Sequence, residues 1–326
     1  MSNIRLTICI ATYNRDRFIG ETLDSIVPQL DDDVEILVVD GASTDNTQEI
    51  MEQYAADELR VRYVRLPAKG GVDQDYDRSV TLANGEYCWL FTDDDVLKPG
   101  AVLAVKNAIR EGHDLIVMNA EVRDRTMKKV LQGRRIEQRD NAVYGPDESE
   151  KLFADTFVYL SFIGAVVIRT RVWLNRDRQS YFGTEFVHLG AIFQKPLSGT
   201  SVVIAEPLII IRYGNAQWSP RSFDIWMFKW PRLVWSFENI GPEAKTRISS
   251  KKPWMRFKAL VVQRSMGRYS IQIYRRYLAA LRVNAAWKAC AWIIAYLPRG
   301  ILIRFHYLYA FLKGADSKPW LDNHFA

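Results

Sequence analysis

The stretch YCWLFTDDDVLKPG, residues 87–100, carries three consecutive aspartates directly after a run of apolar, strand-forming residues. We call Asp93, Asp94 and Asp95 the aspartate triplet. Pro99 and Gly100 then mark a turn into the next element. Three ionised carboxylates within one turn repel each other, so the protein has to offset their charge. A solvated acidic turn or a bound divalent cation would do so, and the rest of the sequence bears on the choice.

Short apolar runs alternate with segments of helical periodicity on both sides of the triplet. Strands are expected over residues 4–11, 34–43, 61–68, 87–95 and 113–120, and helices over residues 18–30, 44–56, 75–85 and 99–112. Because the strand runs are apolar enough to be buried on both faces, the pattern predicts βαβ units and a mainly parallel sheet flanked by helices, an α/β fold.

The loops at the carboxyl ends of these strands are polar and should line one crevice, because ligands of such sheets bind at that edge. They read TYNRD at 12–16, DGASTD at 40–45 and TDDD at 92–95. The first loop has no glycine-rich turn, which disfavours an NAD or FAD enzyme, and the chain has no P-loop motif. A phosphate group would then need a cation or basic side chains, and Mg²⁺ and Mn²⁺ prefer carboxylate oxygens.

Beyond residue 120 the alternation weakens. Strands are expected within residues 161–173 and 200–215, with a helix over 181–196 between them, and residues 121–150 are expected to form a loop or hairpin. The N-terminal apolar run is short, which favours a first strand over a signal peptide. Three widely spaced cysteines are typical of reduced thiols and support neither disulfides nor a zinc site.

Charge divides the chain into two parts. Residues 1–220 hold 25 Lys and Arg against 33 Asp and Glu, a balance of −8, whereas residues 221–326 hold 19 against 5, a balance of +14. The second part also carries seven of the ten tryptophans. We therefore expect two domains, 1–220 and 221–326, with different partners.

Three motifs, ATYNR at 11–15, VVDGASTDNT at 38–47 and ANGEYCWLFTDDDVLKPGAV at 83–102, resemble the inverting glycosyltransferases of family 2. With GGVDQDYDRSV at 70–80, the sequence is most similar to O-antigen and capsule sugar transferases, including abequosyltransferase-like members. The resemblance implies a Rossmann-like GT-A fold, followed here by a basic, aromatic-rich helical region. It also implies transfer of a sugar from a nucleotide-sugar donor with a divalent metal, Mn²⁺ or Mg²⁺.

The resemblance implies roles for individual residues. Those expected to bind the nucleotide are Thr12, Tyr13, Asn14, Arg15 and Asp40. Asp93 would lie near the ribose and Asp94 on the metal, with Asp95 as a further metal ligand because the register of the triplet is ambiguous. Asp73 and Asp77 would bind the donor, or lie on an ordinary solvated helix face.

The same resemblance implies roles for residues near the acceptor and the diphosphate. Glu185 would be the general base that takes the acceptor's proton, although a helix N-terminus would favour a glutamate there without catalysis. His188 would orient Glu185 or be a buried structural histidine. Arg212 would contact the diphosphate or be a surface arginine.

The basic region lacks an unbroken apolar stretch long enough to span a bilayer. Its mixture of Trp, Tyr, Lys and Arg favours amphipathic helices on an anionic membrane surface, and the alternative is a packed helical subdomain. Nucleic-acid binding is disfavoured, because no known nucleic-acid module accompanies the charge. A polyprenyl-diphosphate-linked saccharide acceptor would place the protein in the cytoplasm, peripheral on the inner face of the plasma membrane.

Two other functions fit parts of the pattern. One is a non-catalytic, membrane-associated polysaccharide-assembly protein that retains the fold. The other is a sugar nucleotidyltransferase, which the lack of a glycine-rich, Lys- or Arg-bearing loop after the first strand disfavours.

Overall fold

The structure is a computed structural model that describes residues 4–215 and 219–304. The chain divides into two compact units, one of residues 1–215 with 236–248 and one of residues 216–235 with 249–326. The first unit thus includes Ser236–Ile248, a segment from beyond residue 220, where the sequence analysis placed its boundary. The functions expected of the two parts stay predictions.

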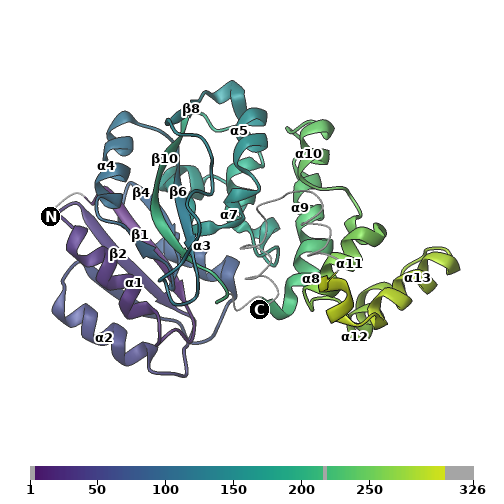
Figure 1. Ribbon diagram of the computed structural model, residues 1–326. Coiled ribbons are helices and arrows are strands. Elements are labelled where there is room, and N and C mark those ends of the chain that lie inside the picture. Colours follow the sequence, from purple (N-terminus) through teal and green to yellow (C-terminus); the bar gives the residue numbers. More distant parts are fainter. Residues whose placement is uncertain (1–3, 216–218, 305–326) are drawn as a thin grey trace. The chain divides into compact units, whose positions relative to one another are not determined.

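One mixed, mostly parallel sheet forms the centre of the first unit (Figure 1). The strands in spatial order are β3 (Val61–Arg65), β2 (Val34–Asp40), β1 (Leu6–Thr12), β4 (Tyr87–Phe91), β9 (Val166–Arg169), β6 (Leu115–Arg123), β10 (Ser201–Arg212) and β5 (Val96–Leu97). The first four are mutually parallel, and β10 runs parallel to β6, whereas β9 is antiparallel to both of its neighbours. Two short strands pair outside this order, β7 (Val130–Gln132) with β6 and β8 (Ala142–Tyr144) with β10. The predicted α/β fold class is confirmed.

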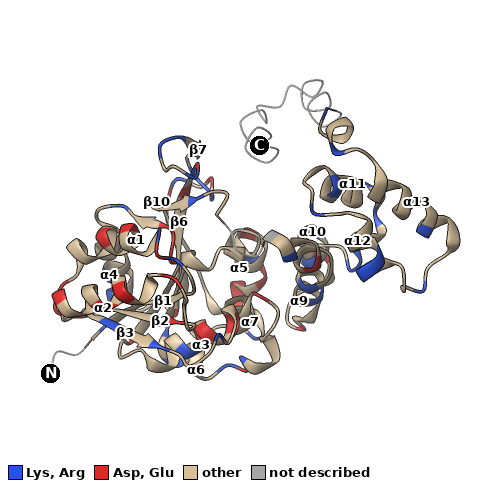
Figure 2. Ribbon diagram, turned by 90° about the horizontal axis from the view of Figure 1, so that it is seen from below, with Lys and Arg blue, Asp and Glu red and all other residues tan. Residues whose placement is uncertain are grey.

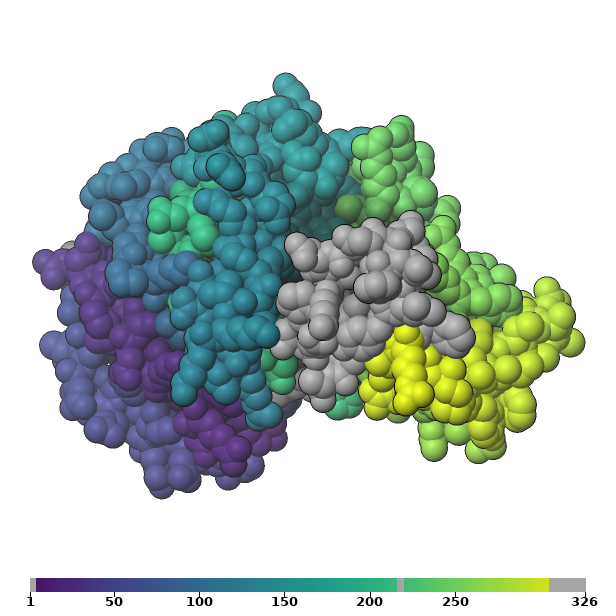
Figure 3. Space-filling model, in the orientation of Figure 1, coloured from purple at the N-terminus to yellow at the C-terminus, as the bar shows by residue number. Residues whose placement is uncertain are grey.

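Helices cover both faces of the sheet because its central strands are buried on both sides; every residue of β2 and β4 is buried. The predicted helices in the first half are α1 (Ile19–Ile26), α2 (Thr47–Asp57), α3 (Val72–Leu82) and α4 (Ala101–Glu111). Figure 2 shows α1, α2 and α4 on one face, and α3, α5 (Ser149–Thr156) and α7 (Val187–Phe193) on the other. Figure 3 shows the surface of one face of the molecule, in the orientation of Figure 1.

The second half of this unit differs from the sequence prediction in detail. The helix expected over 181–196 is only α7, because Gly183 and Glu185 before it take positive φ angles of 83° and 73°. The strand expected within 161–173 is β9, followed by α6 (Thr170–Leu174), and α5 was not expected. Single 3₁₀ turns are η1 (Val27–Gln29), η2 (Pro146–Glu148), η3 (Tyr159–Ser161), η4 (Ile163–Ala165) and η5 (Gln179–Tyr181).

The segment Ser236–Ile248 returns to the first unit through an aromatic contact. The ring of Phe237 lies 5.8 Å from that of Phe157 and 6.1 Å from that of Phe193. The helix α10 (Pro242–Ile248) follows, and the Gly241 N–H donates to Glu150 Oε2 at 3.1 Å. Burial of these rings explains why the segment belongs to this unit.

The second unit is helical, as expected for the basic region. Its elements are η6 (Ser219–Arg221), α8 (Ser222–Asp224), the π-helical turn η7 (Ile225–Lys229), α9 (Trp230–Ser236), η8 (Pro253–Met255), α11 (Phe257–Ser265), α12 (Ile271–Ile273), η9 (Tyr274–Leu278) and α13 (Ala285–Tyr296). Its own core includes Phe223 stacked on Tyr269 at 5.1 Å and Trp254 edge-on to Trp287 at 5.6 Å. Within the described ranges no helix has the length and apolar character that crossing a bilayer requires. The end of the basic region, residues 305–326, lies outside the described residues.

Candidate active site

Three loops meet where β1, β2 and β4 end. Parallel pairing sets Thr12 beside Asp40 at the carboxyl ends of β1 and β2, and β4 ends next to them at Phe91. The Asn14 N–H donates to Ser43 Oγ at 2.9 Å, which joins the loop after β1 to the loop after β2. The predicted crevice edge is therefore assembled from residues far apart in sequence.

Arg15 joins the first loop to the aspartate triplet. Its Nε donates to Asp93 Oδ1 at 3.1 Å, and its Nη2 lies 3.7 Å from Asp94 Oδ2. Asn215 completes the group, since its Nδ2 donates to Asp94 Oδ2 at 2.8 Å and its carbonyl accepts from Arg15 Nη1 at 3.3 Å. The sequence predicted roles for Arg15 and both aspartates, but none for Asn215. The only sequence signal was its place three residues after Arg212, at the end of a strand.

Burial raises the pKa of all three carboxyl groups of the triplet. The pKa of Asp93 rises to about 7, although the charge of Arg15 opposes the shift. The pKa of Asp94 is also raised by burial, and that of Asp95 is raised well above its usual value. The triplet is thus not a solvated acidic turn, and for Asp93 and Asp94 the charge of Arg15 only partly opposes the effect of burial on the pKa.

Asp95 holds the turn together through both carboxylate oxygens. Oδ1 accepts the Arg212 N–H at 2.7 Å, and Oδ2 accepts the Thr92 hydroxyl at 2.5 Å. The Arg212 side chain donates to the carbonyl of Asp94 at 3.0 Å and pairs with Glu21 at 2.5 Å. These contacts anchor β10 to the triplet. The metal role predicted for Asp95 and the donor role predicted for Arg212 stay predictions.

The remaining residues expected to bind nucleotide also lie at this edge. Asp40 is fully buried and accepts from the Ser43 hydroxyl at 2.6 Å and from the Tyr63 hydroxyl at 2.7 Å. Thr12 is buried next to Asp93, and its side chain opposes the rise in the pKa of that carboxyl. Lys69 Nζ lies 3.5 Å from the centroid of the Tyr13 ring, a cation–π contact that sequence analysis missed.

Glu185 and Asp73 are bonded to each other, whereas the side chains of His188 and Asp77 contact other parts of the first unit. The Glu185 N–H donates to Asp73 Oδ2 at 2.9 Å. His188 is buried and donates from Nε2 to the carbonyl of Leu160 at 2.7 Å, and burial lowers its pKa to about 4, so it is neutral. The carboxylate of Asp77 accepts from Trp173 Nε1 at 2.9 Å and from Arg178 Nε at 2.6 Å, which ties α3 to the segment around α6.

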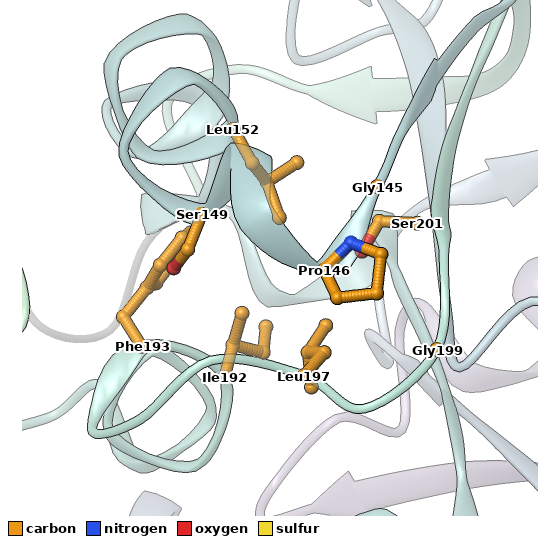
Figure 4. Close-up of a pocket in the computed structure, with 9 residues that line it drawn as sticks. All are labelled: Gly145, Pro146, Ser149, Leu152, Ile192, Phe193, Leu197, Gly199 and Ser201. Atoms are coloured by element: carbon orange, nitrogen blue, oxygen red, sulfur yellow. The ribbon is translucent and has the colours of Figure 1, made fainter.

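A small pocket elsewhere in the first unit does not compete as a substrate site. It lies between the start of α5, the end of α7 and the segment before β10, as Figure 4 shows. Pro146, Leu152 and Leu197 are among the residues that line it. Its free volume of about 10 Å³ is room for roughly one water molecule.

The triplet fits a divalent cation by its chemistry. Among the described residues no cluster of three or more His, Cys, Asp or Glu side chains could hold a metal ion by itself. Mg²⁺ in nucleotide enzymes is commonly held by only one or two carboxylates, with substrate phosphates completing the shell. Asp93 and Asp94 are two neighbouring carboxylates with side-chain exposures of 12 and 13%, and burial raises the pKa of both. Those two side chains match that donor set.

Comparison with known sequences identifies the class of protein. The profile of Glycosyl transferase family 2 matches residues 7–171, which include the three loops and the triplet. The chain therefore belongs to glycosyl transferase family 2, and the predicted GT-A fold is confirmed.

Individual proteins and solved structures are also similar to this chain. Abequosyltransferase RfbV of Salmonella typhimurium is 28% identical in an alignment of 229 residues that covers 64% of this chain and 67% of that protein. The GalNAc(5)-diNAcBac-PP-undecaprenol beta-1,3-glucosyltransferase of Campylobacter jejuni is 26% identical over 136 residues, covering 41% of this chain but only 44% of that protein. Among solved structures, S. aureus TarS 1–349 has a TM-score of 0.56 at 16% identity and covers 95% of this chain and 92% of that chain. Another TarS structure, a complex with UDP-GlcNAc, has a TM-score of 0.54 at 13% identity, with coverages of 96% and 93%.

Proposed function

We propose that this glycosyltransferase moves a sugar from a nucleotide-sugar donor to a polyprenyl-diphosphate-linked saccharide, in the synthesis of O-antigen or capsule. The observation that carries the proposal is the group formed by Arg15, Asp93, Asp94 and Asn215 at the edge where three parallel strands end. Such an edge is the usual ligand site of this kind of sheet. The names of the Salmonella and Campylobacter relatives support the choice of sugar transfer and of a lipid-linked acceptor.

The donor binds across the three loops. Tyr13 and Asp40 contact the base and ribose, Arg15 and Arg212 lie toward the diphosphate, and Asp93 lies near the ribose. Asp94 with Asp93 would hold Mn²⁺ or Mg²⁺, and Asp95 serves mainly to shape the turn through Thr92 and Arg212. The chemistry that a bound divalent ion supplies is stabilisation of the negative charge that develops on the leaving diphosphate.

Glu185 is the general base. The acceptor hydroxyl attacks the anomeric carbon from the face opposite the nucleotide, the carbon–oxygen bond to the diphosphate breaks, and its electron pair goes to the diphosphate. Glu185 removes the proton of the attacking hydroxyl. Because the attack and the departure occur on opposite faces, the product has inverted configuration. Glu185 is half-buried, two residues before the start of α7.

The second unit serves the lipid-linked acceptor at an anionic membrane surface. The helix α13 exposes Trp292, Ile293 and Tyr296 by 45, 52 and 52%. An open groove of about 420 Å³ in the same unit is lined in part by Lys252 and Arg282. Exposed aromatic side chains together with cations are typical of surfaces that lie in the lipid headgroup layer. The enzyme would then work in the cytoplasm, peripheral on the inner face of the plasma membrane.

The test is nucleotide release in a panel of nucleotide sugars, with a lipid-linked saccharide acceptor and Mn²⁺. The wild type should release nucleotide with one donor, and both chelation and Asp94→Ala should abolish turnover. Activity that survives both changes would contradict the metal role. A wild type that is inert with every donor, yet still binds anionic vesicles, would favour a non-catalytic assembly protein.

A further inference from the structure

Asp73 lies in the first turn of α3 and is bonded to the loop that carries Glu185. Its side chain is 4% exposed. Oδ2 accepts the Glu185 N–H at 2.9 Å, and Oδ1 accepts the Val187 N–H at 2.9 Å. Both oxygens are therefore bonded to the backbone of one short segment, at a distance of over a hundred residues in sequence. A carboxylate that is buried and bonded through both oxygens is held in place, and so is the segment that it bonds.

The segment needs such support because its backbone is strained. Glu185 has a φ of 73°, in the left-handed region that residues other than glycine rarely adopt. A conformation of this kind costs roughly 1–3 kcal/mol and persists only where the surroundings enforce it. The Val187 N–H is the first of α7 and has no acceptor within its own helix. Asp73 supplies the acceptor for both N–H groups.

The same helical turn of α3 is bonded to the end of β4, just before the aspartate triplet. Tyr76 follows Asp73 by three residues and is 3% exposed. Its hydroxyl donates to the carbonyl of Phe91 at 2.8 Å, and Phe91 is the last residue of β4, two before Asp93. Residues three apart lie on one face of a helix, so a single rigid turn contacts both segments.

We propose that Asp73 is a positioning residue, which holds the Glu185 segment at a fixed place relative to the aspartate triplet. The inference deepens the proposed function and rests on it. Through α3, the group that accepts the acceptor's proton and the group that holds the leaving diphosphate share one rigid support. Burial raises the pKa of Asp73 to about 6, so at pH 7 the carboxylate is mostly ionised and both oxygens accept.

The test compares Asp73→Asn with a matched control. Asn offers one acceptor oxygen and turns an N–H group toward the other backbone donor. We expect kcat to fall by about 10²-fold, since a displacement of about 1 Å has an effect of that order, with the donor KM unchanged. Hydrogen exchange of residues 183–187 should become faster. The control is Asp114→Asn, since Asp114 is 2% exposed and accepts the Gly199 N–H at 2.7 Å, at the amino end of β6. That variant should lose stability but keep kcat.

The outcomes separate the alternatives. A raised donor KM with unchanged kcat would make Asp73 a donor contact and overturn the proposal, as would an equal loss of kcat in the control. If Asp73→Asn does not fold, Tyr76→Phe removes only a hydroxyl, and the proposal requires kcat to fall without a change in the donor KM. An inactive wild type would contradict the proposed function instead. Hydrogen exchange can be measured even if the wild type is inactive. Unchanged hydrogen exchange at residues 183–187 in Asp73→Asn would overturn the positioning role.

Discussion

The Nε–H group of Arg15 donates to Oδ1 of Asp93 at 3.1 Å, across 78 residues of sequence. This ion pair joins the loop after β1 to the loop after β4, and both partners are nearly buried, with side-chain exposures of 11 and 12%. The arginine therefore compensates part of the charge of the triplet in the protein without a ligand.

Arg15→Ala should weaken catalysis strongly. The change leaves Asp93 buried without its ion-pair partner and removes a donor near the proposed diphosphate. A hydrogen bond to a charged group contributes about 1.5–3 kcal/mol, so we expect kcat/KM to fall by about 10- to 100-fold. Steady-state kinetics with the preferred donor measure the change. The control is Arg60→Ala, because Arg60 pairs with Glu58 at a partly exposed turn. Wild-type kinetics for Arg15→Ala, or an equal loss in the control, would contradict the assignment.

His188→Gln should change how stability depends on pH. The folded pKa of His188 is lowered to about 4, below the ordinary value of 6.5. Between these values the unfolded chain binds more protons than the folded one, so this group makes stability fall as pH falls from 6.5 toward 4. Glutamine can keep the bond to the Leu160 carbonyl without titrating.

Urea unfolding at pH 7 and pH 5 measures this effect. The free energy of unfolding of the variant minus that of the wild type should be about 2 kcal/mol higher at pH 5 than at pH 7. If the difference between the two proteins were the same at both pH values, His188 would not be the buried neutral group described here.

Replacing exposed aromatic residues on α13 should weaken membrane binding. Burial of one such side chain contributes about 1.5–3 kcal/mol, so Trp292→Ser with Tyr296→Ser should reduce partitioning into anionic phospholipid vesicles by about tenfold or more. Sedimentation with vesicles measures it. The control is Leu103→Ser, since Leu103 is 58% exposed but lies on α4 of the first unit. Equal binding by the wild type and the α13 variant would contradict the proposed membrane surface.

Much of the sheet and the position of the triplet could be predicted because both depend on local patterns. The strands expected over residues 4–11, 34–43 and 87–95 correspond to β1, β2 and β4, which end at Thr12, Asp40 and Phe91, and parallel pairing brings those ends together. The contacts of Asn215 and Arg212 could not be predicted. They depend on β10 pairing with the two-residue strand β5, which follows the triplet and has no periodicity of its own.

The Glu185 segment is a second part of the structure that the sequence could not predict. Its apolar spacing predicted a helix over 181–196, but the positive φ of Glu185 delays the helix to Val187. In that conformation the Glu185 N–H donates to Asp73, 112 residues earlier, and no local pattern in the sequence indicates such a contact. The role predicted for Asp73 from the family resemblance was donor binding, whereas the observed contacts lead to the positioning role proposed above.

Calorimetric titration of the matching nucleoside diphosphate, with and without Mn²⁺, tests the central claim most directly. In the wild type, Mn²⁺ should strengthen nucleotide binding, because Asp94 and the diphosphate would share the ion. In Asp94→Asn that gain should disappear while metal-free binding stays the same. An equal gain from Mn²⁺ in both proteins, or none in the wild type, would contradict the account.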